Sequence, residues 1–174
     1  MNELGIPFRV VETEHSHEEY PPHLSGGAIA QYLAENKSDA YTKALEPQQI
    51  LLTADTIVWH KGRELGKPAG PQEAFEMIES LSGDTHQVFT GVCLRSDRSR
   101  SSFFALTDVT FSSLDMEEIR YYVDQFRPFD KAGAYGIQEW IGHIAVERIG
   151  GSYFNVMGLP VQRVYSELKA FINK

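Results

Sequence analysis

A carboxylate in the middle of an apolar, β-branched run is the first candidate for chemistry. The run extends from Ile50 to Trp59 and contains Asp55. Such a run is typical of a buried strand, where a carboxylate is costly unless a cation, a metal or hydrogen-bond donors compensate it. Alternatively, Asp55 ends the strand and bonds the backbone of a turn. At this point both interpretations stay open.

Further polar residues stand where a ligand could approach them. Lys67 lies within Gly66-Lys67-Pro68, and Lys131 and Gln138 flank small residues that let a ligand reach the backbone. Acids and lysines together can hold a metal-bound polyphosphate, because carboxylates bind Mg²⁺ while the metal and the lysines neutralise phosphate oxygens. A carboxylate near the metal can also deprotonate a water. The candidates are Glu18, Lys37, Asp55, Thr56, Lys67, Lys131 and Gln138.

Simpler interpretations exist for several of these residues. A single lysine or glutamate on a helix usually belongs to a solvated surface. The segment from His15 to Glu19 contains His-x-His with adjacent acids, which could bind a transition metal. Its Pro-rich setting and the lack of an evident third ligand favour a solvated loop instead. Cys93 lies among apolar residues, which favours buried packing over a reactive thiol.

The composition limits the class of protein. The 174 residues are 42% hydrophobic and 23% charged, as in an ordinary globular domain. The net charge of −8 argues against a nucleic-acid partner, which needs a basic surface. There is no membrane-length apolar run or signal-peptide pattern, and a single cysteine suits a reducing compartment. We therefore expect one domain over residues 1–174, in the cytoplasm, without a membrane partner.

The strands and helices that position the candidate residues are interspersed along the chain. Strands are expected over residues 8–12, 50–59, 86–94, 103–111 and 144–146, with a hairpin-like return from Gly62 to Gly66. Helices are expected over residues 27–45 and 115–126, from Pro71 towards Gly83, and from Pro160 onward. Without strict βαβ alternation, this order predicts an α/β protein with a mixed sheet.

Six motifs follow one another along the chain. They are Ala54-Asp55-Thr56-Ile57-Val58, Gly66-Lys67-Pro68, Leu81-Ser82-Gly83 with His86 and Val88, Thr90-Gly91-Val92, the segment from Asp130 to Gln138, and the segment from Gly151 to Pro160. Together they span nearly the whole chain. In this order they resemble the Maf-like nucleoside triphosphate pyrophosphatases. The form Ala-Tyr-Gly-Ile-Gln, ending at Gln138, is similar to the subgroup that acts on dTTP and UTP.

The resemblance implies a fold, a reaction and an assembly. The fold is a mixed, elongated and twisted sheet flanked by helices, with two lobes around a cleft, similar to the inosine triphosphate pyrophosphatases. The reaction is hydrolysis of a nucleoside triphosphate to the monophosphate and pyrophosphate with a divalent cation, Mg²⁺ or Mn²⁺. The assembly is a homodimer.

The resemblance also implies residue roles. Asp55 would accept a proton from the attacking water, and Glu18 and Asp55 would bind the metal. Lys37 and Lys67 would contact phosphates. Thr56 and Gln138 would select the base, a role that suits an amide because it can donate to and accept from the edge of uracil or thymine.

One part of the family pattern has no counterpart in this sequence. Family members have a strand and a Ser-x-Ser-Pro-Arg-Arg loop ahead of the segment matching Leu4 to Phe8. That loop binds the triphosphate, so the activity of these 174 residues stays open. Two alternatives accompany the dTTP/UTP hypothesis. One is the same reaction on modified or methylated nucleotides, and the other is an impaired nucleotide-binding protein that interacts with the septum machinery.

Overall fold

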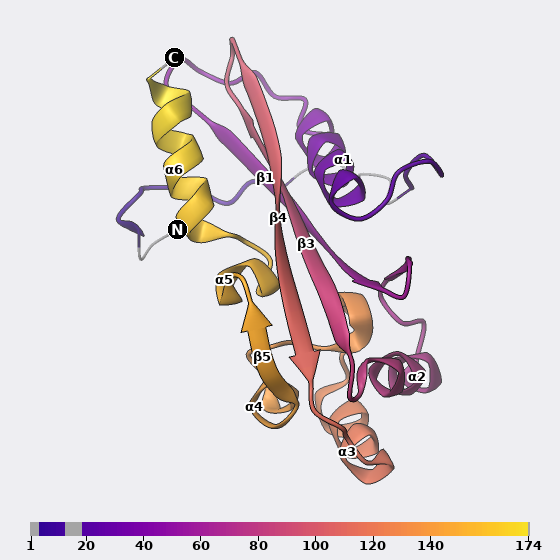
Figure 1. The fold of residues 1–174 in the computed structure, drawn as a ribbon. Coiled ribbons are helices and arrows are strands. Elements are labelled where there is room, and N and C mark those ends of the chain that lie inside the picture. The colour runs from indigo at the N-terminus through magenta and orange to yellow at the C-terminus, as the bar shows by residue number, and fades with distance from the viewer. Residues whose placement is uncertain (1–3, 13–18, 174) are drawn as a thin grey trace. The chain divides into compact units, whose positions relative to one another are not determined.

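The computed structural model describes residues 4–12 and 19–173 (Figure 1). Among them, five strands form one antiparallel sheet in the order β2-β1-β3-β4-β5. The strands are β1 (Leu51–His60), β2 (Arg63–Leu65), β3 (Thr85–Arg95), β4 (Arg100–Phe111) and β5 (Val146–Gly150). The helices are α1 (Gly27–Asp39), α2 (Pro71–Leu81), α3 (Met116–Phe126), α4 (Trp140–Ile144), α5 (Tyr153–Val156), α6 (Val161–Ile172) and the 3-10 helix η2 (Ala132–Ala134).

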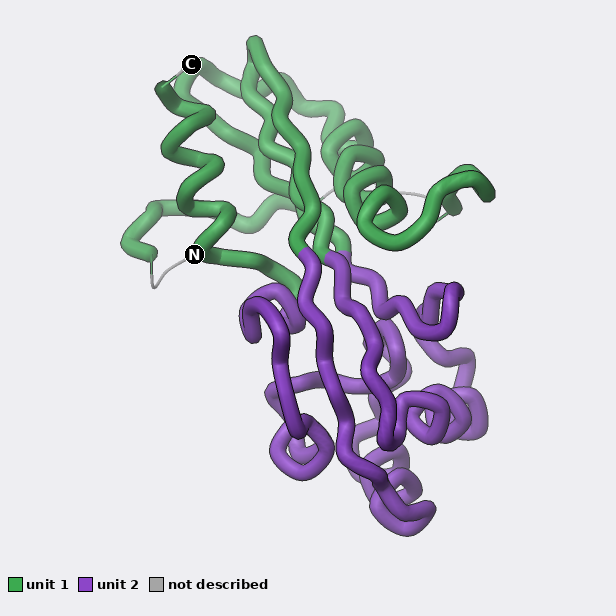
Figure 2. The backbone as a smooth tube through the Cα atoms, viewed as in Figure 1, with its two compact units in different colours: residues 1–55, 90–105, 158–174 green, residues 56–89, 106–157 purple. Residues whose placement is uncertain are grey.

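The chain divides into two compact units, which Figure 2 shows in different colours. Unit 1 comprises residues 1–55, 90–105 and 158–174, and unit 2 comprises residues 56–89 and 106–157. β1, β3 and β4 contribute residues to both units. Each unit has its own hydrophobic core. None of the helices in the described part of the chain is long and apolar enough to span a membrane.

In unit 1, α6 packs on one face of the strands. The apolar positions of α6 recur at helical spacing, so they form a single stripe that the sheet buries. An Arg163 guanidinium lies over the Phe103 ring at 4.6 Å and donates to the Phe104 carbonyl at 2.5 Å. The buried residues of this core are Val92, Leu94, Phe103, Val164, Leu168 and Phe171.

Helix α1 covers the opposite face of the same strands (Figure 1). The Thr53 hydroxyl of β1 donates to the Ala34 carbonyl of α1 at 2.7 Å. Leu52 and Ala54, the neighbours of Thr53 on β1, pack against the α6 core instead. Since side chains alternate across a strand, Asp55 shares the α1 face with Thr53.

The core of unit 2 gathers α2, α3 and the segment from Ala132 to Ile137. α2 and α3 pack together, and Asp115 begins α3 with a capping box in which its side chain accepts from the Glu118 backbone. At Gly133, φ is +67°, and a Cβ there would lie 3.0 Å from the Val58 side chain. Glycine therefore permits the turn that brings this segment against β1.

The predicted α/β class is confirmed, with three corrections to the sheet. The strands run antiparallel rather than in a mixed sheet. Residues 8–12 form no strand, and the apolar side chains of Phe8 and Val10 in this segment are exposed. The strand predicted at residues 144–146 begins at Val146, because residues 140–144 form α4.

The first helix is shorter than predicted. α1 ends at Asp39 rather than near residue 45. The Arg95 guanidinium of β3 donates to the Tyr41 carbonyl at 2.7 Å, and Arg100 of β4 pairs with the Asp39 carboxylate. These contacts with the sheet hold the chain in a turn after Asp39, which local helix propensity cannot indicate.

Candidate active site

The Lys37 ammonium pairs with the Asp55 carboxylate, through Oδ1. The Asp55 side chain is 15% exposed and that of Lys37 is 33% exposed. A cation therefore compensates the carboxylate, as one of the two interpretations of Asp55 required. The alternative, a strand that ends at Asp55, is wrong because β1 continues to His60.

The packing of α1 determines where Lys37 lies. A Cβ at Gly91 of β3 would lie 2.1 Å from the Ala30 carbonyl oxygen, so only glycine allows the helix backbone this close to the sheet. The Thr53–Ala34 hydrogen bond fixes the next turn of the helix. Lys37 follows Ala34 by three residues, which places it on the same side of α1 and over β1.

The end of α1 is anchored directly after Lys37. The Asp39 carboxylate pairs with Arg100 and lies 3.9 Å from the Arg95 guanidinium. The hydrogen bond with Asp39 raises the pKa of Arg100 above its usual value. These contacts hold the last turn of α1, and with it the Lys37 backbone, against β3 and β4.

In unit 2, the structure ties together the segments that carry Lys67 and Gln138. The Gly133 N–H donates to the Gly66 carbonyl at 3.1 Å, which fixes the loop before Gln138 beside the residue that precedes Lys67. The Asp130 pKa is lowered, chiefly by its hydrogen bond with Lys131 and to a smaller extent by the Lys67 charge. Lys67 and Gln138 are both exposed.

Four side chains around this loop, those of Asp130, Lys131, Glu139 and Tyr122, are linked by hydrogen bonds and ion pairs. Lys131 Nζ lies 2.9 Å from Asp130 Oδ1 and 3.2 Å from Glu139 Oε1. The Tyr122 hydroxyl donates to Glu139 Oε2 and accepts from the Gly136 N–H at 3.1 Å. Burial, followed by the hydrogen bond to Glu139, raises the pKa of Tyr122, so the phenol stays protonated at neutral pH.

A buried histidine anchors the middle of the loop. His86 Nε2 and the Tyr135 hydroxyl are hydrogen-bonded at 2.7 Å, and the Phe111 ring meets both rings edge-on. Burial lowers the pKa of His86 to about 4, with a smaller contribution from the charge of His60. Burial also raises the pKa of Tyr135. The pair is therefore neutral at pH 7 and holds the Tyr135 side chain in the core.

Two predicted residues remain to be located. Glu18 lies outside the described residues. Thr56 follows Asp55 on β1, so strand alternation directs its side chain to the other face of the sheet from Asp55. The structure thus brings Lys37 to Asp55 in unit 1 and the Lys67 segment to the Gln138 loop in unit 2.

The donor set around Asp55 suits one kind of metal site. In the part of the chain that is described, no three His, Cys, Asp or Glu side chains are grouped to hold a metal ion. A cage built only from these side chains is therefore not seen there. A single carboxylate beside a lysine fits Mg²⁺ better, because that ion commonly takes one or two carboxylates and completes its shell with phosphate oxygens and water.

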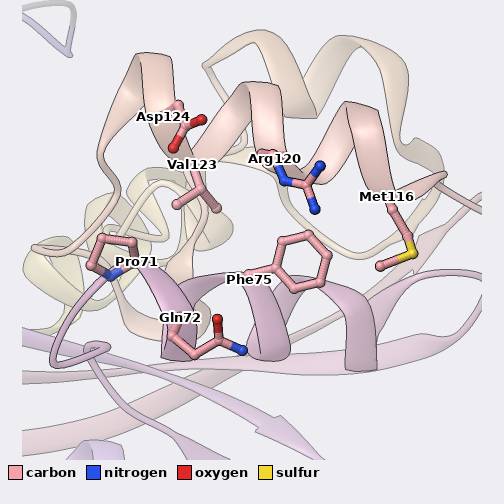
Figure 3. Close-up of a pocket in the computed structure, with 7 residues that line it drawn as sticks. All are labelled: Pro71, Gln72, Phe75, Met116, Arg120, Val123 and Asp124. Carbon is pink, nitrogen blue, oxygen red and sulfur yellow. The ribbon is translucent and has the colours of Figure 1, made fainter.

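A pocket between α2 and α3 in unit 2 contains none of the predicted site residues (Figure 3). Its volume is about 330 Å³, and the Phe75 and Arg120 side chains extend toward one another across it. The lining residues are Pro71, Gln72, Phe75, Met116, Arg120, Val123 and Asp124. The Lys37–Asp55 pair and the exposed Gln138 side chain both lie outside this pocket.

The sequence does not mark Tyr122 and Glu139 as residues that shape the Gln138 loop. Two signals were available. A tyrosine on the inward face of a helix needs a partner for its hydroxyl. Glu139 directly follows Gln138, a predicted site residue. Neither signal could reveal that the two residues bond each other, because seventeen positions separate them.

Comparisons with known proteins place the chain in a family. The family described as "Maf-like protein" matches residues 1–171. The chain is 53% identical over 169 residues to a dTTP/UTP pyrophosphatase of Bacteroides fragilis, which covers 97% of this chain and 88% of the relative. It is 47% identical over 168 residues to a protein of that name from Parabacteroides distasonis, covering 97% and 87%. It is also 45% identical over 170 residues to one from Flavobacterium johnsoniae, covering 98% and 86%. The chain therefore belongs to the Maf-like family.

Proposed function

We propose that this protein hydrolyses dTTP and UTP to the nucleoside monophosphate and pyrophosphate. The observation that carries this proposal is the similarity, over nearly the whole chain, to relatives named dTTP/UTP pyrophosphatases. The Lys37–Asp55 pair supports it, because it places a carboxylate and a cation together at a partly exposed position. A phosphate oxygen and a water could reach both groups there.

Asp55 serves as the general base. Its carboxylate takes a proton from a water, the water oxygen forms a bond to the α-phosphorus, and the bond from that phosphorus to the oxygen bridging to the β-phosphate breaks. Pyrophosphate leaves with the electron pair. A positioned carboxylate contributes about 10²- to 10⁴-fold to such a step.

Lys37 and Lys67 neutralise phosphate oxygens. The Lys37 ammonium has three donors, so it can keep its contact with Asp55 while it binds the substrate. Lys67 is exposed and follows Gly66, whose carbonyl is fixed by Gly133. The positive charges of the two lysines therefore compensate negative charge on the polyphosphate.

A divalent cation, Mg²⁺ or Mn²⁺, belongs to the proposal. Asp55 and Glu18 would hold it together with phosphate oxygens, and it would neutralise the charge that develops on the phosphates. On the family resemblance alone, the proposal also includes a homodimer located in the cytoplasm. Sedimentation of the purified protein at several concentrations would test the dimer.

Thr56 and Gln138 select the base. The Gln138 side chain is exposed, and its amide has no hydrogen bond to any other described residue. It can therefore donate to a carbonyl and accept from the N3–H of uracil or thymine. A base with the opposite pattern would leave these groups unpaired, which is the physical source of discrimination.

The direct test is pyrophosphate release from dTTP, UTP, CTP and GTP, with Mg²⁺ or Mn²⁺, by this 174-residue chain. We expect release from dTTP and UTP to exceed release from the other two. If methylated or other modified nucleotides are added to the same assay, faster release from them than from dTTP and UTP would support the same reaction on another base. Binding of dTTP without turnover would contradict the enzymatic proposal and favour a nucleotide-binding protein.

A further inference from the structure

Gln138 lies in a short loop whose two ends are bonded to one hydroxyl. The Gly136 N–H donates to the Tyr122 hydroxyl at 3.1 Å, and that hydroxyl donates to the Glu139 carboxylate. The Glu139 N–H in turn donates to the Gly136 carbonyl at 2.9 Å, closing a turn. Tyr122 therefore joins the residues on either side of Ile137-Gln138.

A lysine fixes the same carboxylate from a second direction. Lys131 Nζ lies 3.2 Å from Glu139 Oε1, so the two carboxylate oxygens have different partners. A Cβ at Gly136 would lie 2.9 Å from Glu139 Cδ and 3.1 Å from Lys131 Cε. Glycine at this position lets the ion pair close over the loop backbone.

The tyrosine that bonds the loop is itself immobilised by the core. Its side chain is fully buried, and its ring stacks on Phe126 with centroids 5.1 Å apart. Ile137 is also buried, whereas Gln138 is exposed. The loop therefore exposes the Gln138 side chain. Its backbone is bonded to Tyr122 at Gly136 and closed by the turn at Glu139, and its Ile137 side chain is buried in the core.

We propose that the Tyr122 hydroxyl and the Glu139 carboxylate are positioning residues that set base specificity through Gln138. The inference rests on the proposed function, since it assumes that Gln138 reads the base. An amide discriminates between bases best when it is held in one position, because a freely turning amide satisfies either hydrogen-bond pattern. The bonds of Gly136 and Glu139 fix the backbone on both sides of Gln138, and so limit the positions that its amide can reach.

The test compares kcat/KM for UTP and for CTP in matched variants. Tyr122→Phe keeps the buried ring and removes only the hydroxyl, so we expect the UTP:CTP ratio to fall by about tenfold. Tyr121→Phe is the control, because Tyr121 is half-exposed on the same helix and contacts Trp140 through its ring alone. We expect the control to leave the ratio within about twofold of the wild type.

A second set of variants distinguishes a loss of loop positioning from a general loss of activity. In a Gln138→Ala protein, Tyr122→Phe should no longer change the ratio, since the amide that it positions is gone. Glu139→Gln keeps an acceptor for the Tyr122 hydroxyl and should retain more of the ratio than Glu139→Ala. Faster amide hydrogen exchange over residues 136–139 in Tyr122→Phe would show directly that the loop has loosened.

The results that would reject the positioning role of Tyr122 and Glu139 differ from those that would reject the proposed hydrolysis of dTTP and UTP. If the wild type prefers dTTP and UTP and Tyr122→Phe keeps that preference, the positioning role is wrong and the proposed function stands. Equal losses on all nucleotides, or additive effects with Gln138→Ala, would also reject positioning. A wild type without preference for dTTP and UTP would overturn both.

Discussion

The Lys37 ammonium on α1 and the Asp55 carboxylate on β1 form an ion pair across eighteen residues of sequence. The pair depends on how closely α1 approaches the sheet, which Gly91 permits and the Thr53–Ala34 hydrogen bond fixes. An isolated carboxylate in this strand would be costly to desolvate. The same lysine that offsets this cost is the one to which the proposed function gives a phosphate contact.

Replacing Asp55 by asparagine should nearly abolish turnover while the fold is retained. Asparagine has a similar shape but cannot take a proton from water, so we expect kcat to fall by about 10²-fold or more. Asp97→Asn, on the β3–β4 hairpin tip, is the matched control and should keep full activity. Pyrophosphate release with dTTP measures both. Activity of Asp55→Asn comparable to the wild type would remove Asp55 from the mechanism.

Replacing Lys37 by methionine should weaken both substrate binding and stability. The phosphate contact is lost, so we expect KM for dTTP to rise about tenfold, and the free energy of unfolding to fall by about 1 kcal/mol because Asp55 loses its partner. Lys43→Met is the control, since Lys43 is exposed on the turn after α1. Asp55→Asn added to Lys37→Met should recover the lost stability. Urea unfolding measures the free energy of unfolding of the two single variants and the double variant. If the effects of Lys37→Met and Asp55→Asn add, the Lys37–Asp55 pair contributes no coupling energy.

The strand that carries Asp55 could be predicted from sequence, but its partner could not. The apolar run from Ile50 to Trp59 matches β1 closely, since a local pattern determines it. The pairing of Asp55 with Lys37 depends on helix–sheet packing, which no local pattern encodes. The early end of α1 has the same origin, because Arg95 and Arg100 hold the chain after Asp39 through contacts distant in sequence.

The Gln138 loop shows a second limit of sequence reasoning. The sequence correctly predicted an irregular segment here, and η2 is its only helical turn among the described residues from 127 to 139. The bonds that shape it come from a helix residue, Tyr122, and a strand residue, His86. Both were visible as buried aromatic or polar positions, yet their partners could only be found in three dimensions.

Alanine at Gly91 should destabilise unit 1. Its Cβ would overlap the Ala30 carbonyl, at 2.1 Å, so α1 must move or the strand must bend, and we expect a loss of about 1–3 kcal/mol in the free energy of unfolding. Gly150→Ala is the control, because a Cβ on that strand residue would meet its nearest atom at an ordinary 3.6 Å. Urea denaturation measures both variants. Equal stabilities for the two would show that α1 tolerates displacement.

The neutral, buried His86 should make the protein less stable in mild acid. Burial lowers its pKa from 6.5 to about 4 in the folded state. The unfolded chain therefore takes up a proton first, and stability falls as the pH drops from about 6.5, levelling below about 4. The loss attributable to this group is about 3 kcal/mol over that range. Denaturation at several pH values measures the slope.

Two histidine variants isolate this contribution from that of the carboxylates. His86→Gln removes the titrating group and leaves a side chain that can bond the Tyr135 hydroxyl, so the slope between about pH 6.5 and 4 should flatten. His143→Gln, exposed on α4, should keep the wild-type slope. An unchanged slope in His86→Gln would assign the acid sensitivity to other groups, and the low pKa of His86 would then not control stability.

Replacing Gln138 by glutamate should move base preference from uracil and thymine toward cytosine. A carboxylate can only accept hydrogen bonds, so it repels the O4 carbonyl of uracil or thymine, whereas it can accept from the N4 amino group of cytosine. We expect the ratio of kcat/KM for UTP to that for CTP to fall by about tenfold or more. Gln162→Glu, exposed on α6, adds the same charge elsewhere and should leave the ratio unchanged. Unchanged relative rates across the nucleotides in Gln138→Glu would remove Gln138 from base selection, and with it the reason to hold the loop through Tyr122.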